Sequence, residues 1–91
     1  MTIYYRTKDA KADFGFDFEQ QNDGTWRAYI VQQPSYQGRA EDAHATHRLT
    51  HSSRKYVCWT HPLPTLEAAK SVSALWADET QKYIRTGSAF N

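Results

Sequence analysis

The sequence predicts an α+β fold, in which an antiparallel sheet of two β-hairpins carries one C-terminal amphipathic helix on one of its faces. Three observations support this prediction. Phenylalanines alternate with other residues over 14–19, a turn signal over 21–25 leads into a second β-prone run, and apolar residues recur at helical spacing over 65–86. With 91 residues, the chain is expected to form a single domain over 1–91.

The first hairpin has the clearest local signal. A turn with Gly24 in the left-handed region fixes the register, which places Phe16 opposite Ile30 and Phe18 opposite Ala28 on one face. The opposite face then carries two polar pairs, Glu19 with Arg27 and Asp17 with Tyr29. One face is apolar and the other is largely charge-compensated, and a shift of one residue would mix them.

The remaining strands are less sharply defined. Residues 1–12 are either flexible or contribute an edge strand centred on Ile3–Arg6, and 33–43 form a long loop. A second hairpin is expected from strands at Ala45–Leu49 and Arg54–Trp59, joined by a turn at Ser52 and Ser53. The order in which the two hairpins pair stays open.

The helix over 65–86 has recognisable ends. Thr65 is a suitable N-cap, Glu67 lies in the first turn, and Gly87 suits the position after the last turn. The stripe that should face the sheet is Leu66, Ala69, Val72, Trp76, Thr80, Tyr83 and Ile84. Trp76 is the expected anchor of the helix, and Leu75 lies at the edge of the stripe.

Composition restricts the classes of function. Eleven basic and ten acidic residues give a formal charge of +1, so the chain as a whole lacks the basic excess typical of nucleic-acid-binding domains. Cys58 is the single cysteine, which precludes an intramolecular disulfide. No apolar run approaches the ~20 residues of a membrane helix, and the first residues do not resemble a signal peptide. We therefore expect a cytoplasmic protein.

Histidines and the cysteine provide an alternative metal site. A small zinc-binding domain would use His47, His51, Cys58 and His61. Their order, His-x3-His followed by Cys-x2-His, reverses the common finger spacing, and a strand would separate His47 and Cys58 from His61. We expect no cofactor and no metal. A Cys58–His47 pair lacks a third orienting group, so the sequence predicts a protein that is not an enzyme.

Nucleic-acid binding is the main alternative to a protein-binding role. Between Ala43 and His61 there are three basic residues, four histidines and no acidic residue. The side chains that would carry this function combine cations with a stacking surface: Arg48, Arg54, Lys55 and Trp59.

The order of strands followed by a helix that begins Thr-Leu-Glu-Ala-Ala at 65–69 resembles the arm-binding domains of phage-type integrases. Those domains place a three-stranded sheet in the major groove of DNA and brace it with a C-terminal helix. The resemblance covers 26–83 and concerns topology. It implies that Arg27, Tyr29, Arg48 and Lys55 lie near DNA.

Three further stretches resemble small uncharacterised proteins of bacteria and their mobile elements. These are His-Ala-Thr-His-Arg-Leu at 44–49, Tyr-Val-Cys-Trp at 56–59, and the helix from Ala-Leu-Trp-Ala-Asp at 74–78 to Ile-Arg-Thr-Gly at 84–87. The resemblance implies an accessory role, such as a phage- or plasmid-encoded inhibitor that acts on a host protein complex.

A protein partner is the function that the sequence favours most. The long loop offers Tyr36 and Arg39, two residue types enriched at binding hot spots, and the charged sheet face offers Arg27 and Tyr29. We therefore predict a non-enzymatic protein-binding module that uses these four residues. A homodimer, in which an exposed edge strand pairs with its copy, is a second possible protein–protein interaction.

Overall fold

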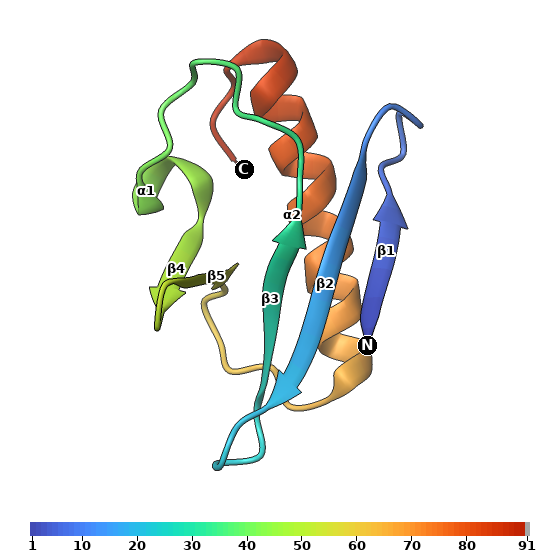
Figure 1. Cartoon of the computed structure of the whole chain (residues 1–91), viewed down its shortest axis with the longest axis vertical. Coiled ribbons are helices and arrows are strands. Elements are labelled where there is room, and N and C mark those ends of the chain that lie inside the picture. The colour runs from blue at the N-terminus through green and yellow to red at the C-terminus, as the bar shows by residue number, and fades with distance from the viewer. Residues whose placement is uncertain (91) are drawn as a thin grey trace.

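The computed structural model describes residues 1–90, which form one antiparallel five-stranded sheet, a short helix α1 and a long helix α2. The elements are, in chain order, β1 (Thr2–Arg6), β2 (Asp13–Gln20), β3 (Trp26–Gln32), α1 (Ala43–Thr46), β4 (Arg48–His51), β5 (Arg54–Val57) and α2 (Leu66–Thr86). Helix α2 covers one face of the sheet (Figure 1). The predicted α+β fold is therefore confirmed. Within residues 1–90, no helix is long and apolar enough to cross a bilayer.

The first hairpin has the predicted register. Phe16 pairs with Ile30, Phe18 with Ala28, and Glu19 with Arg27. The turn closes because Gly24 N donates to Gln21 O at 2.9 Å, with Gly24 at φ 87°.

Of the two alternatives for residues 1–12, the structure has the edge strand. Strand β1 pairs with β2, and Asp78 of α2 holds the strand and its exit in place. The Asp78 carboxylate accepts from Tyr5 Oη at 2.8 Å and from Lys8 N at 2.9 Å. This single acidic side chain therefore fastens the outer strand to the helix.

The second hairpin differs from the prediction at both ends. The strand expected at Ala45–Leu49 is wrong over its first half, because Asp42 accepts from Ala45 N at 3.2 Å and caps the short helix α1 instead. His47 then takes a left-handed conformation, φ 53°, and β4 begins only at the next residue. At the other end β5 stops at Val57 and does not continue to Trp59.

The sheet order is β1-β2-β3-β5-β4, so the second hairpin joins the first through its later strand. Tyr29 of β3 pairs with Tyr56 of β5, and β4 becomes the far edge. The chain therefore crosses from β3 to the outer strand through 33–47 before it returns. This crossing places His47 and the residues that follow β5 next to α2.

Helix α2 begins and ends as the sequence predicts. Thr65 Oγ1 accepts from Ala68 N at 3.0 Å, and Gly87 closes the helix at φ 78°. The main core packs α2 against the sheet and consists of Phe14, Phe16, Ala28, Val57, Trp76 and Ala77. A second cluster of Tyr36, Tyr83 and Ile84 fills the space under the 33–42 loop.

Candidate functional site

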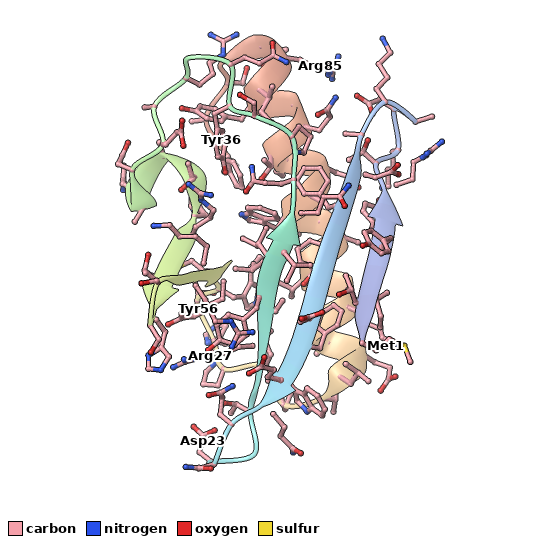
Figure 2. The ribbon with its side chains drawn as sticks, viewed as in Figure 1. Met1, Asp23, Arg27, Tyr36, Tyr56 and Arg85 are labelled. Atoms are coloured by element: carbon pink, nitrogen blue, oxygen red, sulfur yellow. The ribbon has the colours of Figure 1, made fainter. Side chains whose placement is uncertain are left out.

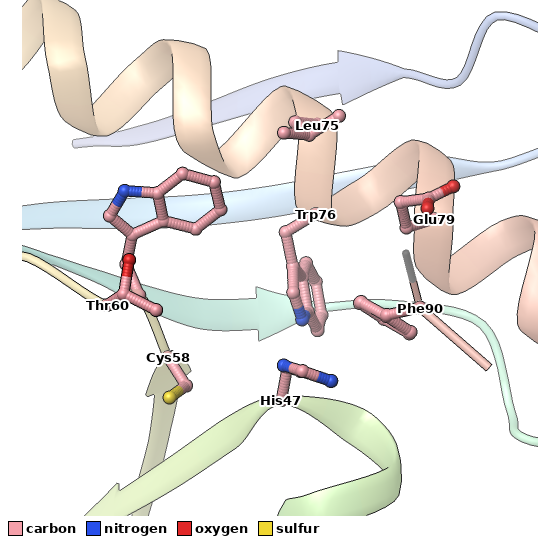
Figure 3. Close-up of a pocket in the computed structure, with 8 residues that line it drawn as sticks. His47, Cys58, Thr60, Leu75, Trp76, Glu79 and Phe90 are labelled. Atoms are coloured by element: carbon pink, nitrogen blue, oxygen red, sulfur yellow. The ribbon is translucent and has the colours of Figure 1, made fainter.

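A groove of about 360 Å³ runs along α2 where the helix faces the start of β4 and the segment after β5 (Figure 3). We call it the apolar groove. Its lining residues are His47, Cys58, Trp59, Thr60, Leu75, Trp76, Glu79 and Phe90. They come from four separate stretches of the chain, so tertiary folding assembles the groove.

Trp76 provides a rigid base for the apolar groove. Only 3% of its surface is exposed, and its ring meets those of Phe14 and Phe16 edge-on, with centroids 5.6 and 6.0 Å apart. The indole Nε1 donates to Thr46 O at 3.0 Å. Because α1 ends at Thr46, this bond also fixes the position of the neighbouring His47. The base of the groove is therefore preorganised.

Two large apolar side chains of the groove remain accessible to solvent. Trp59, from the segment after β5, is 43% exposed, and Leu75, from α2, is 52% exposed. Isolated exposed apolar residues are normal on a surface, but these two line one hollow. Apolar surface gathered in a concave site is typical of a binding site.

The chain's own C-terminal segment occupies one end of the groove. After Gly87 ends α2, the segment folds back so that the Phe90 ring stacks on the His47 imidazole, with centroids 4.5 Å apart and planes 13° apart. Phe90 also meets Tyr83 at 6.4 Å. Figure 3 shows Phe90 and His47 next to the Trp76 side chain. This end of the groove therefore accepts a flat apolar ring carried by a non-helical segment.

Tyr36 does not lie where the sequence predicts. Only 3% of its surface is exposed, and its ring packs on Tyr83, with centroids 6.1 Å apart, and beneath the Arg48 guanidinium at 4.9 Å. This burial raises the pKa of the Tyr36 phenol. The prediction that Tyr36 presents a contact surface is therefore wrong, because the loop uses the ring as core.

Arg39 has a structural role at the end of α2. Its Nε donates to Ile84 O at 3.3 Å and its Nη2 to Arg85 O at 3.4 Å. Carbonyl groups in the last turn of a helix lack partners within the helix, and a cation is a favourable donor to them. Arg39 thereby ties the loop to α2, although the residue remains exposed.

The open face of the sheet, which carries Arg27 and Tyr29, is covered by arginines lying over tyrosines. Arg27 lies 4.5 Å above the Tyr56 ring and Arg54 lies 3.7 Å above the Tyr29 ring (Figure 2 labels Arg27 and Tyr56). Tyr29 is 3% exposed as a result. Arg54 also forms two hydrogen bonds to Glu19, which hold the pKa of that carboxyl below its usual range. Both arginines are thus engaged within the protein.

The residues of the nucleic-acid alternative are dispersed. Arg48 is held by Gln33 Oε1 at 3.2 Å and by the Tyr36 ring. Lys55 donates to Thr50 Oγ1 at 2.7 Å and follows Arg54 on the strand, so the two side chains point to opposite faces. Trp59 lies in the apolar groove. The structure therefore does not bring the four together, nor does it bring together the Arg27, Tyr29, Arg48 and Lys55 set.

The alternative zinc set is not assembled either. His47 and Cys58 are adjacent, with Cys58 N donating to His47 O at 2.8 Å. His51 lies at the other end of β4, roughly 13 Å along the strand from His47. Within residues 1–90, no group of three or more His, Cys, Asp and Glu side chains could hold a metal ion. The strand geometry separates the set.

Part of the apolar groove can be predicted from the sequence. The helical stripe places Leu75 beside Trp76 and outside the buried face, so its exposure follows from the pattern. The contribution of Thr60, Glu79 and Phe90 could not be predicted, because it depends on the order of β4 and β5 in the sheet. Comparison of the chain with protein-family models, with curated proteins and with solved structures finds no match.

Proposed function

We propose that the protein is a small non-enzymatic protein-binding module, and that its apolar groove takes a large apolar side chain from an extended segment of a partner protein. The observation that carries this proposal is the pair Trp59 and Leu75, which expose 43% and 52% of their surface on a groove with a rigid tryptophan base. Tryptophan is among the residues most enriched at binding hot spots.

The kind of segment is inferred from the groove's present occupant. Phe90 reaches one end of the groove from residues outside any helix or strand, and its ring is held flat against His47. A partner segment of the same kind would cover the remaining exposed surface of Trp59 and Leu75.

The open face of the sheet is a less favourable binding surface than the apolar groove. Its two arginines already lie over Tyr29 and Tyr56, and one of them is paired with Glu19. A partner would have to displace these contacts before making its own. The resemblance to small proteins of mobile elements supports a host protein complex as the target, which groove binding would inhibit in the cytoplasm.

The test uses a random peptide library displayed on phage and selected on the wild-type protein. Enriched peptides should carry a large apolar residue. When a bound peptide covers the exposed half of Leu75, this burial should contribute about 1.4 kcal/mol to the free energy of binding, or about tenfold in affinity. Leu75→Asp should therefore weaken the selected peptides by tenfold or more in a fluorescence titration.

A matched control separates the groove from the rest of α2. Ser71 is exposed on the same helix and does not line the groove, so Ser71→Asp adds the same charge elsewhere and should leave peptide affinity unchanged. Equal losses in both variants, or selected peptides without any apolar preference, would refute the groove as the binding surface.

A further inference from the structure

A second hollow, of about 270 Å³, lies at the end of the molecule where α2 terminates. Three segments meet there: the β1–β2 turn, the loop after β3 and the last turns of α2 (Figure 1). Figure 2 labels Arg85 at this end. We call the hollow the basic cleft; its lining residues are Lys11, Ala12, Pro34, Gln37, Arg39, Gln81, Ile84 and Arg85.

The three cations of the basic cleft come from the three different segments and differ in how firmly they are held. Within residues 1–90, no group accepts a hydrogen bond from the Lys11 ammonium. Arg39 is fixed by Ile84 O and Arg85 O, which use two of its five N–H donors. Arg85 Nε lies 3.4 Å from the Asp9 carboxylate. The fold therefore brings three positive charges to one hollow, where they repel one another.

Asp9 does not neutralise this set. Its carboxylate accepts from Thr7 Oγ1 at 2.6 Å, Lys11 N at 3.0 Å and Gln81 Nε2 at 3.2 Å, besides its contact with Arg85. The Thr7 hydroxyl and the Lys11 amide hold its pKa below the usual range. One carboxylate against three cations leaves excess positive charge at the cleft.

Gln81 holds Asp9 at the edge of the cleft. The residue lines the cleft, is only 8% exposed, and directs its Nε2 to Asp9. Its Oε1 is buried, and no donor within residues 1–90 reaches it. A buried acceptor without a donor costs about 1–3 kcal/mol.

We propose that the basic cleft binds the phosphate group of a small molecule, namely a phosphate monoester or a diphosphate. Arginine presents paired N–H donors that match phosphate oxygens, and lysine adds a mobile point charge. The volume is just below the range of about 300–1,000 Å³ usual for drug-sized ligands, which favours a compact anion. The site is separate from the apolar groove and does not depend on the proposed function.

Amide chemical shifts followed by NMR during titration with pyrophosphate and with a sugar monophosphate test the proposal. At about 1 mM ligand, the weak end of useful affinities, the amides of Lys11, Gln81 and Arg85 should shift together. Lys11→Gln removes one charge-assisted contact and should weaken binding by about tenfold or more. Lys70→Gln removes the same charge from a part of α2 outside the cleft and should have no effect.

Three results would overturn the proposal. The first is the absence of shifts at the cleft, and the second is an equal loss of affinity in the two lysine variants, which would show unspecific attraction. The third is binding of a single-stranded oligonucleotide without any binding of the two small ligands, which would make this end of the molecule a nucleic-acid surface. Leu75→Asp should bind pyrophosphate as the wild type does, so failure of the groove and failure of the cleft are distinguishable.

Discussion

Replacement of Trp76 by alanine probes the residue on which both the fold and the apolar groove depend. Trp76 is 3% exposed, meets Phe14 and Phe16 edge-on, and donates to Thr46 O. Leu75→Ala is the matched control, because Leu75 is the neighbouring residue of α2 and is 52% exposed.

The expected cost follows from these contacts. Truncation of a buried tryptophan to alanine destabilises a protein by about 3–5 kcal/mol. Part of this is the loss of two aromatic contacts of about 0.5–1.5 kcal/mol each, and part is a buried Thr46 carbonyl left without its donor, about 1–3 kcal/mol. A chain of 91 residues has a stability of about 5–14 kcal/mol, so Trp76→Ala should remove a large fraction of it. Leu75→Ala should cost about 1 kcal/mol or less.

Urea denaturation followed by circular dichroism measures both effects. If Trp76→Ala does not fold, Trp76→Phe keeps an aromatic ring, loses only the indole donor among the polar contacts, and should cost about 1–3 kcal/mol. Trp76 would be refuted as the anchor of α2 if Trp76→Ala lowered the free energy of unfolding by less than about 2 kcal/mol, or by no more than Leu75→Ala does. The slope of free energy against urea should stay unchanged if only stability is altered.

Three further changes test particular contacts. Gly15→Ala places its Cβ 2.9 Å from Tyr4 Cε1 and 3.2 Å from Thr2 Cγ2, so it should lower the free energy of unfolding of the wild type by about 1 kcal/mol and that of a Tyr4→Ala background by less. An equal loss in both urea titrations would contradict the contact with Tyr4. Gly87 has a φ of 78°, so Gly87→Ala should lower the free energy of unfolding by about 1 kcal/mol or more in the same assay. An unchanged free energy of unfolding would contradict the role of Gly87 at the end of α2. Burial, and then the hydrogen bond to Asp78, raises the pKa of Tyr5 from 10.0 to about 12. The stability that Tyr5 confers is therefore complete below pH 10 and lost as pH rises toward 12; Tyr5→Phe should abolish this loss, and an unchanged alkaline transition would refute it.

Where local pattern is decisive, the sequence alone determined the structure. The alternation of Phe14, Phe16 and Phe18 with the turn at Gly24 specified the first hairpin and its register, because one face had to be apolar. The spacing from Thr65 to Gly87 specified α2 and both of its ends, because caps and apolar periodicity act within a few residues.

Tertiary structure decided the features on which function depends. The capping of α1 by Asp42 overrode the strand propensity of residues 45–47, and the β3-β5-β4 order brought His47 beside α2. Tyr36 was predicted to face a partner, but the loop that carries it covers the end of α2, and its ring became core. The apolar groove and the basic cleft each join side chains from segments far apart in the chain. Local propensity acts over neighbouring residues, whereas these sites depend on which elements pack together, and a single sequence pattern does not contain that information.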